Sequence, residues 1–263
     1  MIYNENQLQE ILKNPNYQDI GALPSQFHGY SWDKMYIRPF LIPDFTLISK
    51  AAAMGDMNHM LRAIDLTITQ DARELTIGDF YYTMMWLRIH SMPKTPLIVD
   101  WTCEAGVLTH KETGAIIFND DDFQNPENVH EYEVKECGAQ TTESITMVNL
   151  EILSLDEDPE KVVLPEGFDF PRAKHIEDIK AALKDPEKTM LVPAVQWIAG
   201  ETLADKFRAL NNAENGLDMF ATAQALNERY SNHGIREVTT LSCRRCRNKV
   251  PYEVSVTPLS FFH

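Results

Sequence analysis

Cysteine is scarce in this chain, which has four in 263 residues: Cys103, Cys137, Cys243 and Cys246. So low a density is unlike the disulfide frameworks that stabilise small secreted domains. Residues 1–5 lack the basic region and apolar core of a signal peptide, and no apolar run approaches the ~20 residues needed to span a bilayer. We therefore expect a protein made in a reducing cytoplasm, with no membrane partner, whose cysteines bind metal.

The short signatures of common enzyme classes are also missing. The sequence contains no Gly-x-Ser-x-Gly elbow, no Walker A loop, no Gly-x-Gly-x-x-Gly fingerprint and no His-Glu-x-x-His pair. The eight histidines are scattered without the spacing of metal ligands. No nucleophile, base and orienting group can be named together, so we expect no enzyme activity, no catalytic residue and no cofactor-binding residue.

Positive charge is in short supply as well. Lysine and arginine number 24 against 39 aspartates and glutamates, a formal net charge of -15. Contacts to nucleic-acid phosphates require clustered Lys and Arg, so the balance argues against a nucleic-acid partner. The one basic cluster surrounds the C-terminal cysteines, where it either offsets thiolate charge or faces solvent. Its members are Arg236, Arg244, Arg245, Arg247 and Lys249.

The order of apolar patterns predicts an α+β fold, because helices, strands, helices and strands follow one another in blocks. We expect helical N-terminal and C-terminal segments around a small antiparallel β region with a zinc-ribbon-like cysteine knuckle. The expected segments are an N-terminal helix and extended arm (1–40), a helical domain (41–95), a β-rich region with an acidic insertion (96–172), a helical region (173–234), and the knuckle with a terminal strand (235–263).

Local signals place several of the helices. Asp44 is a plausible N-cap, Gly55 is expected to kink or break the helical run after it, and Thr76 with Asp79 has the spacing of a capping box. Strands are expected at 97–103 and 133–137. The expected helices are 4–13, one from residue 44, one from residue 76, 175–184, 187–199, 202–211 and 214–230.

The Cys243-x-x-Cys246 motif lies between two apolar runs, 237–241 and 250–256, and predicts a metal-binding knuckle on a hairpin. A redox pair would need the motif to open a helix, yet Pro251 and a β-rich run follow it; free thiols are the other alternative. We expect a structural Zn²⁺ at Cys243 and Cys246, with Cys103 and Cys137 as the remaining ligands. His110 and His130, which flank the acidic loop, are reserve ligands if one cysteine does not reach the metal.

Three segments together carry a family resemblance: Tyr36-Ile37-Arg38-Pro39-Phe40, the run from Leu75 to Arg88, and the ending with Cys-x-x-Cys, a strand and Leu259-Ser260-Phe261-Phe262. They resemble an opening strand, a helix ending in Leu-Arg, and a knuckle with a Phe-Phe tail in the baseplate hub proteins of T-even-type contractile-tailed bacteriophages. The acidic insertion between Cys103 and Cys137 departs from the tighter cysteine pair of that family, and the aromatic arm has no counterpart in it.

The resemblance implies a non-enzymatic structural or assembly component of a viral tail baseplate. Such a protein would bind other baseplate and tail proteins and further copies of itself, and would reside in the virion after synthesis in the host cytoplasm. Two alternatives stay open. One is a cytoplasmic tail-assembly chaperone that is absent from the mature virion. The other is a zinc-ribbon regulator associated with nucleic acid, which the arginines near the knuckle favour and the net charge opposes.

The arm formed by residues 21–34 carries Phe27, Tyr30 and Trp32 but little periodic pattern. Exposed aromatic side chains are unfavourable unless they are covered, and aromatic anchors dominate many interfaces. We therefore expect the arm to contact either another baseplate subunit or a second copy of the chain. The alternative is that it folds back over its own helices.

Overall fold

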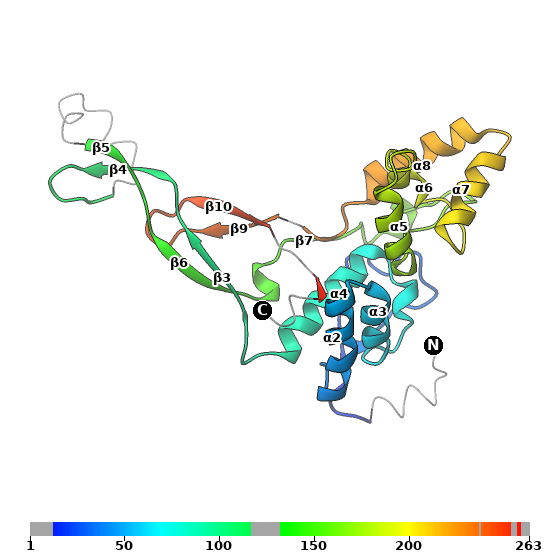
Figure 1. Ribbon diagram of the computed structural model, residues 1–263, viewed down its shortest axis with the longest axis horizontal. Helices are drawn as coiled ribbons and strands as arrows, with labels where there is room; N and C mark the ends of the chain where they lie inside the picture. Colours follow the sequence, from blue (N-terminus) through cyan, green and yellow to red (C-terminus); the bar gives the residue numbers. More distant parts are fainter. Residues whose placement is uncertain (1–12, 117–131, 237, 254–256, 259–263) are drawn as a thin grey trace. The chain divides into compact units, whose positions relative to one another are not determined.

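The computed structural model describes residues 13–116, 132–236, 238–253 and 257–258 (Figure 1). The predicted α+β fold is confirmed: helices occur together with small antiparallel sheets. The chain forms two compact units. The helical unit comprises Met1–Thr95, Glu151–Arg236 and Ser255–His263, and the hairpin unit comprises Pro96–Leu150 and Glu237–Val254. No helix of the described residues is long and apolar enough to cross a membrane.

The first segment of the helical unit contains the predicted helices that begin near residues 44 and 76. Its elements are β1 (Gln18–Asp19), β2 (Tyr36–Ile37), η1 (Ile42–Asp44), α2 (Phe45–Met54), α3 (Met57–Asp65), η2 (Ala72–Glu74) and α4 (Ile77–Ser91). The helix predicted after Thr76 is confirmed, since the Thr76 hydroxyl accepts the Asp79 N–H at 3.2 Å. The predicted break at Gly55 is also confirmed, because this residue ends α2 with a left-handed φ of 64°.

Asp44 precedes α2 as predicted, but its carboxylate does not cap that helix. It accepts the Leu41 N–H and pairs with the buried Arg38 guanidinium, each at 2.7 Å. The same guanidinium donates to the Leu66 carbonyl at 2.8 Å. Arg38 and Asp44 therefore fix the turn into α2 against the end of α3. The predicted helix at 4–13 falls almost wholly on residues 1–12, outside the described residues.

The second segment of the helical unit contains most of the expected helices. Its elements are β7 (Ile152–Leu153), η6 (Pro159–Lys161), η7 (Ala173–His175), α5 (Ile176–Leu183), α6 (Val192–Val195), α7 (Leu203–Asn212), α8 (Gly216–Tyr230) and β8 (Gly234–Ile235), with β7 and β8 paired antiparallel. The continuous helix predicted over 187–199 is wrong, because only α6 is α-helical there. Pro193 lies in its first turn, and proline is tolerated only at that end of a helix.

An aromatic core joins three parts of this second segment. Phe170, Trp197 and Tyr230 are buried with ring centroids 5.5 to 6.4 Å apart. Ala223 and Leu226 of α8 pack into the same cluster. Burial of these large rings contributes apolar stabilisation between α8 and the residues that follow α6.

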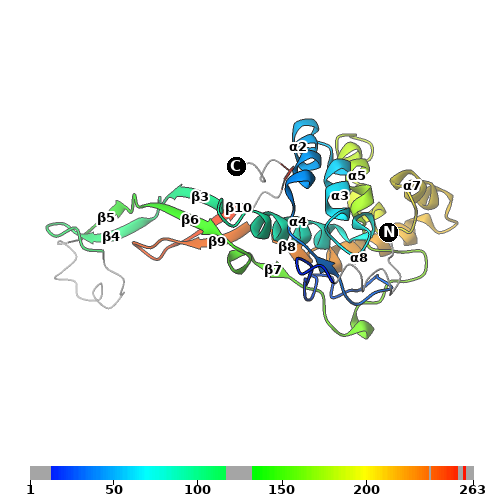
Figure 2. The ribbon, with the colours of Figure 1, turned by 90° about the horizontal axis from the view of Figure 1, so that it is seen from below.

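The hairpin unit consists of two-stranded antiparallel ladders. Its elements are β3 (Leu97–Thr102), β4 (Gly106–His110), β5 (Tyr132–Glu136), β6 (Gln140–Ile145), η5 (Met147–Asn149), β9 (Val238–Ser242) and β10 (Lys249–Glu253). β3 pairs with β6 and β4 pairs with β5, which together form one long hairpin, and β9 pairs with β10 in a short hairpin. Figures 1 and 2 both show the short hairpin lying alongside the β3–β6 pair.

Isolated two-stranded ladders are marginally stable in water. In this unit Val134 is 74% exposed, whereas Val99 and Leu241 are buried. A buried cluster of this unit is centred on Cys103, Cys137 and Cys243. Three of the four cysteines therefore belong to the buried part of the unit.

Candidate metal centre

The long hairpin brings Cys103 and Cys137 close together. Cys103 follows the last residue of β3, and Cys137 follows the last residue of β5. Thr102 pairs with Gln140, and Gly106 pairs with Glu136. The two ladders therefore share one register, and residues 103–105 and 137–139 form an opening between them. Each cysteine therefore sits at the same kind of break, on opposite strands of one hairpin.

Backbone hydrogen bonds fix this opening almost symmetrically. The Cys103 N–H donates to the Ala139 carbonyl at 3.0 Å, and the Cys137 N–H donates to the Ala105 carbonyl at 2.8 Å. Gly138 adds an N–H bond to the Cys103 carbonyl at 2.9 Å and has a φ of 60°, a conformation in which glycine is favoured. These hydrogen bonds hold the opening in the conformation in which both sulfurs join one cluster.

The other two sulfurs come from the turn between β9 and β10. The Cys243 N–H donates to the Asn248 carbonyl at 2.9 Å, and the Arg247 N–H donates back to the Cys243 carbonyl at 2.8 Å. Arg247 has a left-handed φ of 58°, which closes the turn. The prediction that Cys243 and Cys246 lie on a hairpin knuckle is confirmed.

All four cysteine sulfurs lie within 4.8 Å of one another. The Sγ atoms of Cys103 and Cys246 are 3.6 Å apart, and those of Cys137 and Cys243 are 3.8 Å apart. None is in a disulfide. A tetrahedral ion with metal–sulfur distances of about 2.3 Å would hold neighbouring sulfurs about 3.8 Å apart. The four residues thus fit a tetrahedral thiolate site and can hold one metal ion.

Backbone amides also point at the sulfurs. Each sulfur accepts a hydrogen bond from the N–H two residues further along the chain: Ala105 for Cys103, Ala139 for Cys137, Arg245 for Cys243 and Asn248 for Cys246. Amide donors stabilise negative charge on sulfur. The same local geometry therefore recurs at all four positions, although only two of them share a Cys-x-x-Cys motif.

Burial and these amides oppose each other in the thiol pKa values. Burial raises the pKa of Cys103, Cys137 and Cys246 above the usual thiol value. Burial acts in the same direction on Cys243, but the amides of Cys246 and Arg245 outweigh it and bring its pKa to about 7. Without metal, Cys243 is the thiol that most readily carries negative charge near neutral pH. A bound cation would draw protons from all four.

The basic cluster has a mixed role. The Arg245 guanidinium donates to the Cys137 carbonyl at 2.7 Å, which ties the knuckle to the long hairpin. Arg244, Arg245 and Arg247 are all exposed. Of the reserve ligands, His110 is held by the amides of Glu112 and Thr113 at the end of β4, apart from the sulfur cluster. His130 lies outside the described residues, as does most of the acidic insertion.

Comparisons of this chain with protein-family models, curated proteins and solved structures gave no match.

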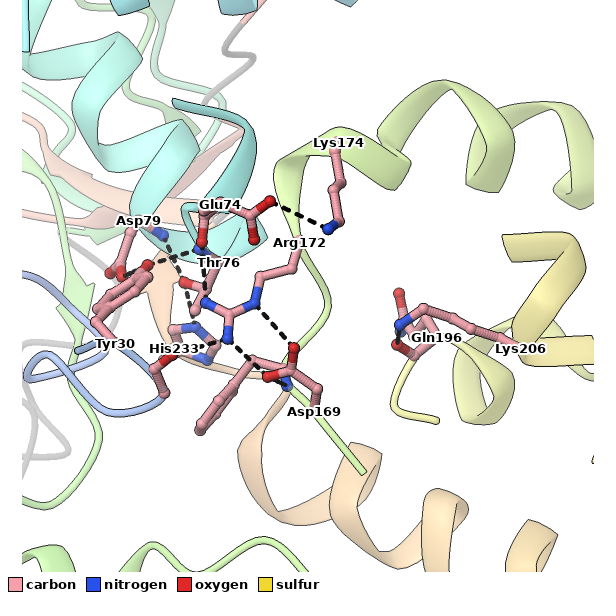
Figure 3. Close-up of polar contacts among 12 residues, drawn as sticks. Tyr30, Glu74, Thr76, Asp79, Asp169, Arg172, Lys174, Gln196, Lys206 and His233 are labelled. Carbon is pink, nitrogen blue, oxygen red and sulfur yellow. Dashed lines mark hydrogen bonds and ion pairs between the residues drawn. The ribbon is translucent and has the colours of Figure 1, made fainter. Parts of the chain in front are cut away.

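Sequence reasoning missed a buried polar network in the helical unit, drawn in Figure 3. The Tyr30 hydroxyl donates to the fully buried Asp79 carboxylate at 2.6 Å and accepts the Thr76 N–H at 2.6 Å. The Thr76 hydroxyl contacts His233 Nε2 at 3.0 Å. Since His233 Nδ1 donates to the Tyr230 carbonyl at 2.7 Å, the neutral ring accepts at Nε2. The network ties the arm, the start of α4 and the end of α8 together.

Arg172 extends this network. Its guanidinium donates to the carbonyls of Gly29 and Glu74 at 2.8 and 2.9 Å, pairs with Asp169 at 2.6 Å, and lies 5.3 Å from the centre of the Tyr30 ring. These contacts hold backbone segments that are far apart in the sequence, so their evident effect is to stabilise the helical unit.

The same contacts decide between the two expectations for the arm. Tyr30 stacks on Trp32 with ring centroids 4.1 Å apart, and Phe27 meets Trp32 edge to face at 5.8 Å. The Ser25 N–H donates to Asp79 at 2.9 Å. The arm therefore folds back over its own unit, and a contact with another subunit stays a prediction.

A second feature that the sequence did not signal is Lys206 of α7. Its side chain is 1% exposed, and its Nζ donates to the Gln196 carbonyl at 2.7 Å (Figure 3). Among the described residues no carboxylate lies within ion-pair distance of it. Burial, reinforced by the positive charges of Arg172 and Lys174, lowers its pKa from 10.5 to about 8, although Asp169 acts in the opposite direction. The buried His175 has a lowered pKa for the same main reason.

Proposed function

We propose that this chain is a non-enzymatic structural or assembly protein whose hairpin unit is held together by Zn²⁺ at Cys103, Cys137, Cys243 and Cys246. The observation that carries the proposal is the cluster of four sulfurs within 4.8 Å, to which two separate hairpins each contribute two cysteines. Four thiolates fill a tetrahedral zinc ion and leave no open position for a substrate or water. Such a site supports stability and not metal-centred catalysis.

Zinc is the ion that the donor set favours most simply. Thiolates select soft or borderline ions, and a tetrahedral arrangement of four sulfurs is typical of zinc or of iron–sulfur centres. Zinc with four thiolates carries a net charge of −2. The backbone amide donors at the sulfurs and the nearby Arg245 guanidinium are placed to stabilise that charge.

The metal assignment is tested by elemental analysis of protein purified without added metal. We expect one zinc per chain, and a loss of zinc in Cys137→Ser and Cys243→Ser. Arg244→Ala, in an exposed residue of the same turn, should keep the full zinc content. Iron in place of zinc, or no metal in freshly purified reduced protein, would contradict the assignment.

We place this structural role in the tail baseplate of a contractile-tailed bacteriophage. The support is the ordered resemblance of the segments at 36–40, 75–88 and 243–262 to hub proteins of that group. In the structure, Arg38 of the first segment anchors the turn into α2, and the second segment forms α4, so both segments serve the framework of the helical unit.

Quantitative mass spectrometry of purified virions tests this placement. A structural baseplate protein should be present at a fixed ratio to other tail proteins. A tail-assembly chaperone would bind those proteins in infected-cell extract but be missing from the particle. Absence from both the particle and tail-protein complexes would contradict any role in the tail.

A further inference from the structure

The four sulfurs of the metal centre differ in their access to solvent. Cys103, Cys137 and Cys243 are 0%, 2% and 1% exposed, whereas Cys246 is only partly buried. Cys246 is flanked along the knuckle by the exposed Arg245 and Arg247. Of the four cysteines, Cys246 is therefore the residue that a small oxidant from solvent reaches most easily, and exposure is one of the factors that make a thiolate susceptible to oxidants.

Cys246 also has a defined neighbour that can complete an oxidation. The Sγ of Cys103 lies 3.6 Å away, the shorter of the two sulfur–sulfur contacts. The other contact joins Cys137 and Cys243 at 3.8 Å, and both of those residues are buried. One pair thus contains the partly exposed Cys246, the other consists of two buried residues, and each pair spans the two hairpins.

We propose that Cys246 is a peroxide-sensitive modification site and that Cys103 is its resolving partner. The inference rests on the proposed zinc site. The Cys246 thiolate attacks one oxygen of hydrogen peroxide; an S–O bond forms, the O–O bond breaks and hydroxide leaves. The Cys103 thiolate then attacks the resulting sulfenic acid. A Cys103–Cys246 disulfide forms, the S–O bond breaks and a second hydroxide leaves.

The electron balance closes over these two steps. The two sulfurs together lose two electrons, and the peroxide gains two and ends as two hydroxide ions that take up solvent protons. Zinc loses two of its four ligands and is released, since Cys137 and Cys243 alone do not make a closed tetrahedral site. The long hairpin and the knuckle stay joined, because the new disulfide replaces one of the two links that the metal supplied. Oxidation therefore exchanges a metal link for a covalent one.

The test treats the zinc-loaded full chain with hydrogen peroxide, follows zinc release with a colorimetric chelator, and maps disulfides by mass spectrometry. We expect one zinc released per chain, together with a Cys103–Cys246 linkage, and recovery of zinc binding after reduction with a thiol. A Cys243–Cys246 linkage as the first product, or release of zinc without any disulfide, would overturn the proposal.

Two matched variants test whether the exposure of Cys246, and not the loss of any one cysteine ligand, sets the rate of zinc release by peroxide. Both replace a cysteine by histidine, because sites of three cysteines and one histidine also bind zinc. Cys246→His removes the exposed sulfur, and Cys137→His removes a buried one. We expect zinc release from Cys246→His to be about tenfold slower or more, since its remaining thiolates are buried, and release from Cys137→His to match the native chain. Equal rates in the two variants would overturn the proposal. If neither variant holds zinc, the first disulfide of the native chain decides alone.

Failure of the zinc assignment gives a different result from failure of this inference. Native protein that contains no zinc when purified contradicts the metal site itself, before any oxidant is added. Native protein that contains zinc but forms no Cys103–Cys246 bond contradicts only the oxidation chemistry.

Discussion

Replacement of Tyr30 by Phe tests whether the buried polar network holds the helical unit together. The substitution removes one oxygen and keeps the ring that stacks on Trp32. That oxygen has two partners, the Asp79 carboxylate and the Thr76 N–H, each at 2.6 Å. Asp79 is 0% exposed, so water cannot replace the lost hydrogen bond without rearrangement. Both partners are then left without their shortest hydrogen bond.

The magnitude follows from these two orphaned groups. A buried donor or acceptor left unpaired costs about 1–3 kcal/mol, so we expect Tyr30→Phe to lower the free energy of unfolding by about 3 kcal/mol. Tyr36→Phe is the matched control. Tyr36 is partly buried, and the described residues give its hydroxyl no hydrogen-bond partner, so the expected loss is below about 0.5 kcal/mol.

Urea unfolding followed by tryptophan fluorescence measures this difference, because Trp32, Trp86 and Trp197 all belong to the helical unit and only Trp101 belongs to the hairpin unit. Absorbance titration adds an independent readout. Burial, with the nearby Asp79 charge, raises the pKa of Tyr30 well above its usual value, so one tyrosine should resist ionisation until the unit unfolds. A Tyr30→Phe loss no larger than that of Tyr36→Phe would refute the reasoning.

Three further predictions concern the metal centre, Lys206 and nucleic acid. Cys137→Ser should abolish zinc binding, and because metal-binding free energy is folding free energy in such sites, it should also destabilise the hairpin unit. Hydrogen-exchange mass spectrometry should then show that β9 and β10 lose protection while α4 and α8 keep it. The free energy of unfolding should rise with pH between about 8 and 10.5. In this window the folded chain has lost the Lys206 proton, because its pKa is about 8, whereas the unfolded chain, with a pKa of 10.5, still holds it. Lys206→Met should flatten that rise by on the order of 2–3 kcal/mol, as judged from urea unfolding at each pH; an unchanged slope would contradict the lowered pKa. Finally, the protein should not shift DNA in gels at physiological salt, given its net charge of -15, and replacement of Arg244 and Arg245 by Ala should make no difference.

The parts of the fold that the sequence predicted are those with local signals. Thr76 and Asp79 are three residues apart, Gly55 acts on its own helix, and the knuckle lies between two adjacent strands. In each case the physical cause is contained within a few residues. The helix expected over 187–199 failed because periodicity was given more weight than Pro193, whose ring confines it to the first turn.

The rest depends on contacts between distant positions. Tyr30 and Asp79 are 49 residues apart, and Thr76 and His233 are 157 apart, so no local pattern could indicate their network. The four cysteines were predicted as a set because they are the only ones in the chain. Their arrangement was not, since the opposition of Cys103 and Cys137 follows from the register of the long hairpin. Lys206 gave no signal, because its sequence neighbours fit an ordinary exposed helix face.

The wide sequence separation of the sulfur pairs has a consequence for biosynthesis. Cys103 and Cys246 are 143 residues apart, and Cys137 and Cys243 are 106 apart. A nascent chain therefore exposes its first two thiols on the ribosome long before the knuckle has been translated. The loop that must close to complete the site contains the whole second segment of the helical unit, and its entropic cost falls if that segment has already folded and shortened the effective loop. On the proposed function, completion of the metal centre is then among the last events in the maturation of the chain, and a chain cut short before Cys243 lacks two of its four ligands.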